Sequence, residues 1–214
     1  MKKIAVKLNL DGGRIEKLEI GENIILDRFE RIDGKIGSTH ICVPNFGSEL
    51  NEYELPFHGY ARNEKWDIVE ERDNFIKIRY LMKNRDLYPT DLEMTQTFDF
   101  KEKFVHKVKV KNIGKKIAPV NIAIHYYFNM PYGWQDLSIN GENVRVIVEK
   151  DSEIRARQNN IITDGKRTIF METRNVKDLH LWSGGNQNFC CIEPVMGMRE
   201  VKTDEEIEMI IGLE

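Results

Sequence analysis

Two polar segments of the sequence carry residue types that could bind and act on a small polar molecule. In VNIAIHYYF (120–128) the aliphatic residues alternate up to Ile124, so His125 and Tyr127 belong to the opposite face of a strand. Small, polar and aromatic side chains together suit a sugar, because aromatic rings contact the apolar flank of a pyranose and fixed polar groups bind its hydroxyls. In NFCCIEPV (188–195) Glu193 is the one charged residue. A carboxylate in such apolar surroundings is either paired or functional.

A third segment, ELPFHGYARNEKWDIVEE (54–71), places His58 and Arg62 four residues apart between apolar clusters and turn residues. Each candidate also fits an ordinary structural role. A lone histidine is most often a hydrogen-bonded structural residue, Arg62 equally suits a surface ion pair, and Glu193 equally suits a buried partner for an arginine. The residue types alone leave these alternatives open.

The remaining histidines are expected to be structural. His106 lies in FVHKVKVKNI (104–113) and shares the apolar parity of Phe104 and Val108, as a hydrogen-bonded core residue would. His40 and His180 are assigned the same structural role.

No motif in the sequence predicts a metal or a cofactor. Cys42, Cys190 and Cys191 form no CxxC pair and no Cys/His cluster with metal-ligand spacing, and their odd number argues against a disulfide framework. The glycines form neither a GxGxxG nor a GxxxxGK loop, and no GxSxG elbow occurs. We therefore expect neither a bound metal nor a cofactor.

The elements that must position these residues are predicted to be strands. Apolar and polar residues alternate with a period of two, turn dipeptides such as Asn140-Gly141 separate the runs, and no segment has a helical stripe. Strands with close turns and no alternating helices favour an all-β antiparallel sandwich or barrel. The clearest β-rich runs are 22–29, 75–82, 92–100, 104–113, 144–150, 167–173, 178–182 and 205–213.

The 214 residues, 41% of them hydrophobic, suit one core, so we expect a single domain over 1–214. The net charge of −3 is spread over intermixed acidic and basic residues, and this argues against a nucleic-acid partner. No apolar run has the length of a signal peptide or a membrane span, so no membrane partner is expected and the protein is expected to be cytoplasmic. No feature indicates an oligomeric state.

Taken in order along the chain, these segments resemble the aldose 1-epimerase (galactose mutarotase) family. The similar pieces are DGGRIEKLEIGENIIL, GSTHICVPNFG, LPFHGYARNEKWDI, IHYYFN, LWSGG and FCCIEPVMG. HGYARNxxW is the most specific of these motifs, and its order with HYYF and CIEP strengthens the match. The resemblance covers nearly the whole chain and implies the antiparallel supersandwich of that family. The chain is short for the family, so its loops are expected to be reduced.

The resemblance implies a role for each candidate. The family's catalytic base falls on Glu193, its acid histidine on His125, and its second site histidine on His58. Arg62 follows as a residue that binds the sugar or a phosphate on it. The family also uses an aspartate on the sugar hydroxyls, and here Asp136 and Asp164 both remain open.

The implied reaction interconverts the α- and β-anomers of a hexose. A base removes the proton of the C1 hydroxyl, an acid protonates the ring oxygen, and the ring opens and recloses on the other face. A carboxylate and an imidazole suffice, so no cofactor is required. The alternatives are a hexose 6-phosphate substrate and a carbohydrate-binding sandwich without turnover. Family members that use the 6-phosphate place an arginine where this chain has Ile36, which favours the free sugar.

Overall fold

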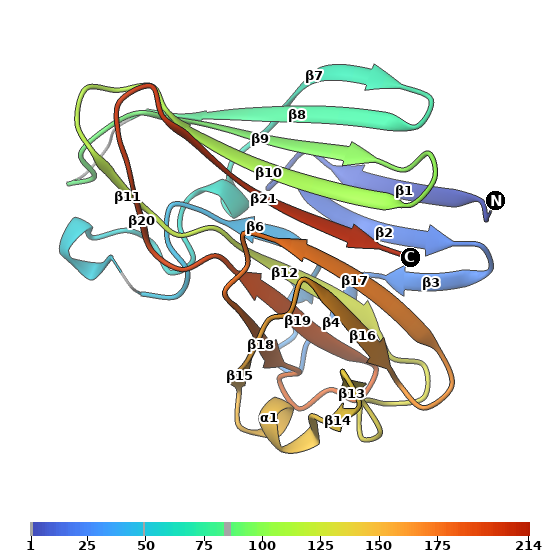
Figure 1. The fold of residues 1–214 in the computed structure, drawn as a ribbon. Coiled ribbons are helices and arrows are strands. Elements are labelled where there is room, and N and C mark those ends of the chain that lie inside the picture. The colour runs from blue at the N-terminus through green and yellow to red at the C-terminus, as the bar shows by residue number, and fades with distance from the viewer. Residues whose placement is uncertain (1, 49, 84–86) are drawn as a thin grey trace.

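The computed structural model describes residues 2–48, 50–83 and 87–214, which fold into two large antiparallel sheets (Figure 1). The eight-stranded sheet contains β1 (Ile4–Asn9), β2 (Arg14–Ile20), β3 (Asn23–Leu26), β6 (His40–Cys42), β12 (Ala123–Asn129), β15 (Ser152–Arg155), β18 (Asp178–Trp182) and β19 (Phe189–Val195). The nine-stranded sheet contains β7 (Asp67–Arg72), β8 (Phe75–Met82), β9 (Leu92–Asp99), β10 (Phe104–Asn112), β13 (Ser138–Ile139), β14 (Glu142–Asn143), β16 (Asn159–Thr163), β17 (Thr168–Arg174) and β21 (Glu206–Leu213). The predicted antiparallel all-β class is confirmed.

Two smaller strand pairs and three short helical segments complete the described chain. β4 (Phe29–Glu30) pairs with β5 (Ile36–Gly37), and β11 (Ala118–Val120) pairs with β20 (Arg199–Val201). The helical segments are the 3₁₀ turns η1 (Asn51–Tyr53) and η2 (Ala61–Asn63) and the α-helix α1 (Arg145–Glu149). No helix in the described ranges is long and apolar enough to cross a bilayer.

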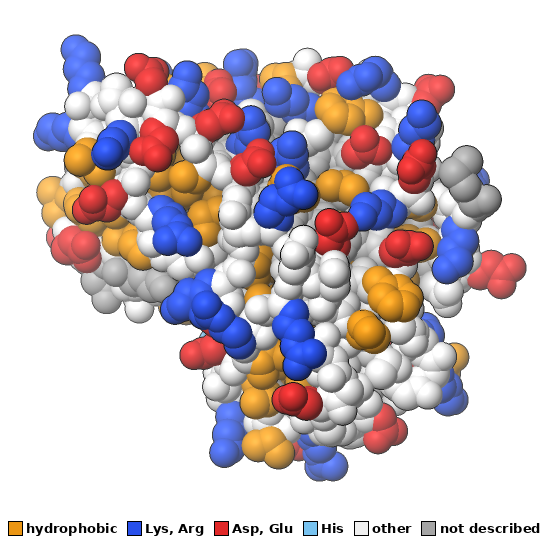
Figure 2. Space-filling model, viewed as in Figure 1, with side chains coloured by type: hydrophobic (Ala, Val, Ile, Leu, Met, Phe, Trp, Pro, Cys, Tyr) orange, Lys and Arg blue, Asp and Glu red, His pale blue; other side chains and the backbone are white. Residues whose placement is uncertain are grey.

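The two sheets share one hydrophobic core. Along β10 buried and half-buried side chains alternate strictly, with Phe104 and Val108 among the buried ones. They join Ile124 and Phe128 of β12, in the other sheet, in one continuous apolar cluster. The outward face of β10 carries lysines that pair with acidic residues of β21, such as Lys109 with Glu206. On the face seen in Figure 2, basic and acidic side chains are intermixed.

His106 lies in this core as predicted, with both ring nitrogens bonded. Its Nε2 is 3.0 Å from Oε1 of Gln96 and its Nδ1 is 2.8 Å from the hydroxyl of Tyr126. Gln96 in turn donates to the carbonyl of Gly13. Burial lowers the pKa of His106 to about 3, so the ring is neutral.

The prediction of a strand at 144–150 is wrong, because this segment forms α1. Val144 and Val148, one helical turn apart, are buried, whereas Val146 between them is 55% exposed. An ion pair between Arg145 and Glu149 spans the turn, and the Asn143 side chain accepts the backbone N–H of Arg145. These local contacts outweigh the strand preference of three valines and an isoleucine.

Candidate active site

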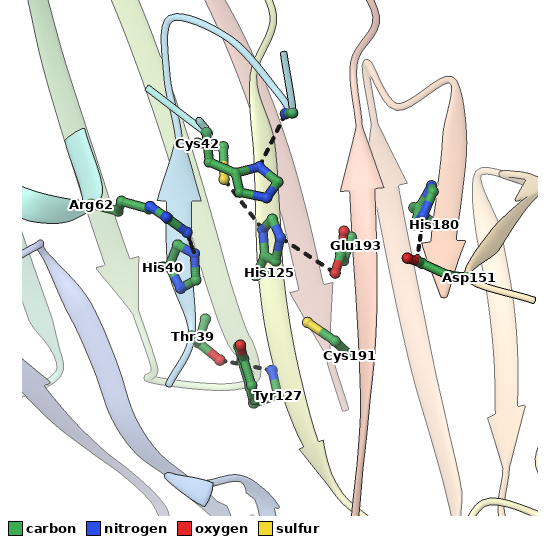
Figure 3. Close-up of polar contacts among 12 residues, drawn as sticks. Thr39, His40, Cys42, Arg62, His125, Tyr127, Asp151, His180, Cys191 and Glu193 are labelled. Atoms are coloured by element: carbon green, nitrogen blue, oxygen red, sulfur yellow. Dashed lines mark hydrogen bonds and ion pairs between the residues drawn. The ribbon is translucent and has the colours of Figure 1, made fainter. Parts of the chain in front are cut away.

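Strand pairing in the eight-stranded sheet places four polar side chains in one row. β6 pairs with β12 so that His40 lies opposite His125, and β18 pairs with β19 so that His180 lies opposite Glu193. Between them, β12 pairs with β19 in the register that sets Tyr126 against Ile192, which puts His125 beside Glu193. Figure 3 shows this row running from His40 through His125 and Glu193 to His180.

The row forms the floor of a cavity of about 480 Å³, a volume within the range of small-molecule sites. The cavity is lined by Arg31, Lys35, His40, Phe46, Gly47, Phe57, His58, Arg62, His125, Tyr127, Asp151, His180, Trp182 and Glu193. The residues singled out in the sequence as site candidates, His58, Arg62, His125 and Glu193, are all in this lining.

His125 and Glu193 are in direct contact at the bottom of the cavity. Nε2 of His125 is 3.4 Å from Oε1 of Glu193, and the two residues are only 6% and 3% exposed. Burial raises the pKa of Glu193 to about 8. Burial, reinforced by His40 and His58, lowers the pKa of His125 well below its usual range. Near neutral pH, Nε2 of His125 and the carboxyl group of Glu193 therefore hold one proton between them, and the pair carries no net charge.

His58 is held at the cavity wall by a strained backbone and two hydrogen bonds. Its φ of +65° is rare for a residue other than glycine. Its backbone N–H donates to the carbonyl of Gly47, and its Nδ1 accepts the N–H of Gly47, each at 3.0 Å. Because Nδ1 is an acceptor, the ring proton is on Nε2. Burial and the nearby Arg62 lower the pKa of His58 to about 4, so the ring acts as a neutral donor.

The following glycine fixes this loop against β6. Gly59 has a φ of +74° and forms a bridge with Val43, and a Cβ at this position would lie 2.2 Å from the Val43 carbonyl oxygen. Only glycine fits such a close approach. The HG pair of the HGYARN segment therefore sets the position of His58.

One end of the cavity is positively charged. Arg62 lies on η2, where its Nη1 is 3.5 Å from Nε2 of His40 and its carbonyl accepts a hydrogen bond from Arg14. Arg31 and Lys35 reach the cavity from the β4–β5 hairpin, which spans residues 29–37. Nε of Arg31 and Nε of Arg62 are buried and have no hydrogen-bond partner among the described residues. This end suits oxygen-rich or anionic groups.

The other end of the cavity is formed by His180 and Asp151. Nε2 of His180 is 2.9 Å from Oδ1 of Asp151, and its Nδ1 is 3.7 Å from Glu153. Neither Asp136 nor Asp164 lines the cavity, and Asp164 is instead paired with Arg167. Asp151 is thus the aspartate that the structure brings to the site.

Sequence reasoning missed His40, His180 and Asp151 as cavity residues. His40 stacks on the ring of His125, with 4.7 Å between centroids and 14° between planes. The segment DLHLW–SGGNQN–FCCIEP does indicate the position of His180. Gly184 and Gly185 favour a hairpin turn, and in that hairpin His180 pairs with Glu193. His40 and Asp151 depended on pairings that no local pattern specifies.

Aromatic side chains supply the apolar surface of the cavity. Trp182 and Tyr127 pack with Phe189, and Arg31 lies 4.8 Å above the Trp182 ring. The β4–β5 hairpin can cover them because Gly37 has no side chain, since a Cβ there would lie 2.3 Å from the Tyr127 ring.

One cluster in the described part of the chain has ligand types that could hold a metal ion. The ligand atoms of His40, Cys42 and His125 lie within 4.8 Å of one another. Arg14 and Arg62 each approach a ring nitrogen of His40 within 3.5 Å. Two guanidinium groups beside the cluster oppose the binding of a cation.

Comparisons with known proteins give a consistent family. The model of the family described as aldose 1-epimerase matches residues 30–164. No curated protein sequence matches significantly. Among solved structures, a galactose mutarotase-like protein from Lactobacillus casei is similar, with a TM-score of 0.84 and 12% identity over 99% of this chain and 97% of that one. A galactose mutarotase related enzyme from Lactobacillus acidophilus has a TM-score of 0.80 and 15% identity over 100% and 97%.

The TM-scores show a common fold in spite of the low sequence identities. The family model covers more than half of the sequence. The supersandwich expected from the motifs is therefore confirmed, and the chain belongs to the aldose 1-epimerase family.

Proposed function

We propose that the protein is an aldose 1-epimerase that interconverts the α- and β-anomers of a hexose. The observation that carries this proposal is the buried His125–Glu193 contact at the floor of a sugar-sized cavity. A carboxyl group and an imidazole that share one proton supply both the base and the acid that ring opening requires. The neutral His58 and the cationic Arg62 supply donors for the oxygens of the sugar.

In the proposed reaction one proton is passed between the members of the pair and the sugar. With the proton on His125, the carboxylate of Glu193 takes the proton of the C1 hydroxyl while His125 donates its proton to the ring oxygen. The C1–O5 bond breaks and leaves an aldehyde, a protonated Glu193 and a neutral His125. Rotation about C1–C2 exposes the other face, and the reverse transfers close the ring. Burial favours the neutral pair, which is both the resting form and the form left in the ring-opened state, so the ion pair that starts ring opening is the minor form.

Exchange NMR on glucose and galactose tests the proposal, since it measures the rate at which the two anomeric signals interconvert. We expect catalysed exchange that scales with protein concentration and disappears in Glu193→Gln. Binding of a sugar without faster exchange would show instead that the protein is a carbohydrate-binding sandwich without turnover.

A hexose 6-phosphate is the second candidate substrate, favoured by the positive end of the cavity. Arg31 and Lys35 reach the site from the β4–β5 hairpin, so cations are present even though position 36 is an isoleucine. The guanidinium group of Arg62 forms no ion pair with a carboxylate among the described residues. Such groups bind phosphate through charge-assisted bonds.

Arg62→Ala distinguishes the two substrates. With a free sugar, Arg62 binds hydroxyls and its loss should weaken every hexose by a similar factor. With a phosphosugar, the parental protein should prefer glucose 6-phosphate over glucose by more than about tenfold, which is ~1.4 kcal/mol, and the variant should lose that preference. The measurement is kcat/KM for both sugars with both proteins.

A further inference from the structure

A second cavity, of about 420 Å³, lies beside the candidate active site. Phe46, Gly47 and His180 line both cavities, so these residues form the wall between two neighbouring spaces. The rings of Phe46 and His180 meet edge to face, with 5.6 Å between their centroids. The second cavity therefore adjoins the His180 end of the site. The cations Arg31 and Lys35 line the first cavity at its other end.

Strand register makes the floors of the two cavities continuous. β18 pairs with β19 so that His180 lies opposite Glu193, and the same pairing sets Asp178 opposite Val195 two residues further along. Side chains two residues apart on a strand point to the same face, and the two pairs are about 7 Å apart along the strands. Asp178 and Val195 line the second cavity. The floor below His180 thus extends by roughly the length of one more sugar ring.

The walls of the second cavity are held in place by contacts within the protein. Phe46 packs against the buried cluster of Cys42, Ala123 and Val195. The backbone N–H of Gly197, another lining residue, donates to the side chain of the fully buried Asn121 at 2.9 Å. A cavity formed in advance in this way binds a ligand without first paying for its own ordering.

The charges in the second cavity differ from those at the cationic end of the first. Its lining contains the carboxylates of Glu153 and Asp178 and the ammonium group of Lys177, which is 3.3 Å from the Asp178 carboxylate. Two carboxylates against one ammonium group disfavour a phosphate or another anion. Val195 and the ring of Phe46 add apolar surface. Apolar surface with a few polar groups suits a neutral sugar ring.

We propose that the second cavity binds a second sugar ring, and that the substrate is a neutral reducing disaccharide. Its reducing-end aldose lies at His125 and Glu193, and a hydroxyl of that ring directed towards His180 carries the link to the second ring. The proposal rests on the mutarotase function proposed above. The chemistry is unchanged, because a reducing disaccharide keeps a free C1 hydroxyl and its glycosidic bond takes no part in ring opening.

The first test compares substrates of the parental protein. Exchange NMR gives kcat/KM for glucose and for maltose, cellobiose and lactose, which differ in the linkage or in the second sugar. We expect at least one disaccharide to exceed glucose by about tenfold or more, because the second ring adds contacts beyond those of the first. A kcat/KM for glucose equal to or above that of every disaccharide would overturn the proposal.

The second test blocks the second cavity while leaving the first intact. Ser48 is exposed and lines the second cavity, so Ser48→Trp should fill that space, and Ser48→Ala is the matched control. In the tryptophan variant the preference for the disaccharide should disappear, with kcat/KM for glucose near parental. Lys177→Ala should raise KM for the disaccharide alone, since Lys177 is an exposed residue away from the His125–Glu193 pair. An equal loss for glucose and disaccharide in Ser48→Trp would contradict a separate sugar subsite.

A binding experiment tests the second subsite without relying on turnover. The methyl signals of Val195 and the backbone amide signals of Lys177 and Gly197 should shift when the preferred disaccharide is added to the parental protein, and should stay in place with glucose. No shift at these residues with any of the three disaccharides would overturn the proposal, whatever the rate of anomer exchange. Shifts with a disaccharide but no catalysed exchange of any sugar would refute the mutarotase function alone and leave a two-ring binding site.

Discussion

In the proposed mechanism, the proton shared by His125 and Glu193 should determine the pH range of activity. Because the active ion pair and the neutral pair contain the same single proton, their ratio does not change with pH. Activity should therefore be level below the Glu193 pKa of about 8 and fall about tenfold per pH unit above it, as the pair loses that proton. The measurement is kcat between pH 6 and 10 by exchange NMR. Activity that keeps rising beyond pH 9 would contradict a shared proton.

Removing either member of the pair should abolish most of the catalysis. Glu193→Gln cannot accept the C1 hydroxyl proton, and His125→Asn cannot donate to the ring oxygen, so each should lower kcat by at least about a hundredfold. Sugar affinity should change much less, because Arg62 and His58 remain in the cavity. Isothermal titration with the substrate separates the two effects. Near-parental rates in both variants would refute the mechanism.

The same carboxyl group should make stability depend on pH. The pKa of Glu193 is raised from an unfolded value near 4.5 to about 8, so the folded state binds the proton more strongly. The resulting stabilisation is complete below pH 4.5 and is lost as pH rises through about 8. Glu193→Gln lacks this ionisation, so its Tm should fall less than the parental Tm between pH 6 and 9. Parallel curves for the two proteins would contradict the raised pKa.

At the scale of elements, His106 tests whether the core and the site are separable. His106→Asn removes at least one of two buried hydrogen bonds and leaves unfilled space beside Phe98, so it should cost about 1–3 kcal/mol of unfolding free energy. The cavity residues lie on other strands, so kcat/KM should stay near parental. Urea unfolding and exchange NMR on the same samples measure both. A loss of activity without a loss of stability would place His106 in the reaction instead.

The strand patterns explain why much of this arrangement could be predicted. Alternation in 104–113 and 120–128 gave the correct face for His106, His125 and Tyr127 without any knowledge of pairing. Strand register was harder, because it depends on contacts between segments far apart in sequence. From strand parity alone we expect His125 and Glu193 to face one cleft across a sugar-sized gap. Adjacent pairing of β12 and β19 instead brings them into contact. In 144–150, one ion pair and two buried valines overrode strand propensity.

For the whole molecule, the shared core predicts a single cooperative unfolding transition. Apolar residues of both sheets form one continuous cluster, so unfolding of either sheet would expose the buried face of the other to water. Trp66 and Trp134, far apart in the sequence, both belong to this cluster. Tryptophan fluorescence and far-UV circular dichroism should therefore give the same urea midpoint. Two separated midpoints would show that residues 1–214 contain more than one folding unit.

The row of His40, His125, Glu193 and His180 also bears on how the protein could change its substrate. These four side chains come from neighbouring strands of a rigid sheet, whereas Arg31 and Lys35 come from the β4–β5 hairpin. Lengthening a surface hairpin costs little, since the entropy of loop closure rises only slowly with length. A longer hairpin at 29–37 could therefore accommodate bulkier or differently charged sugars while the row of four side chains on the sheet stays unchanged.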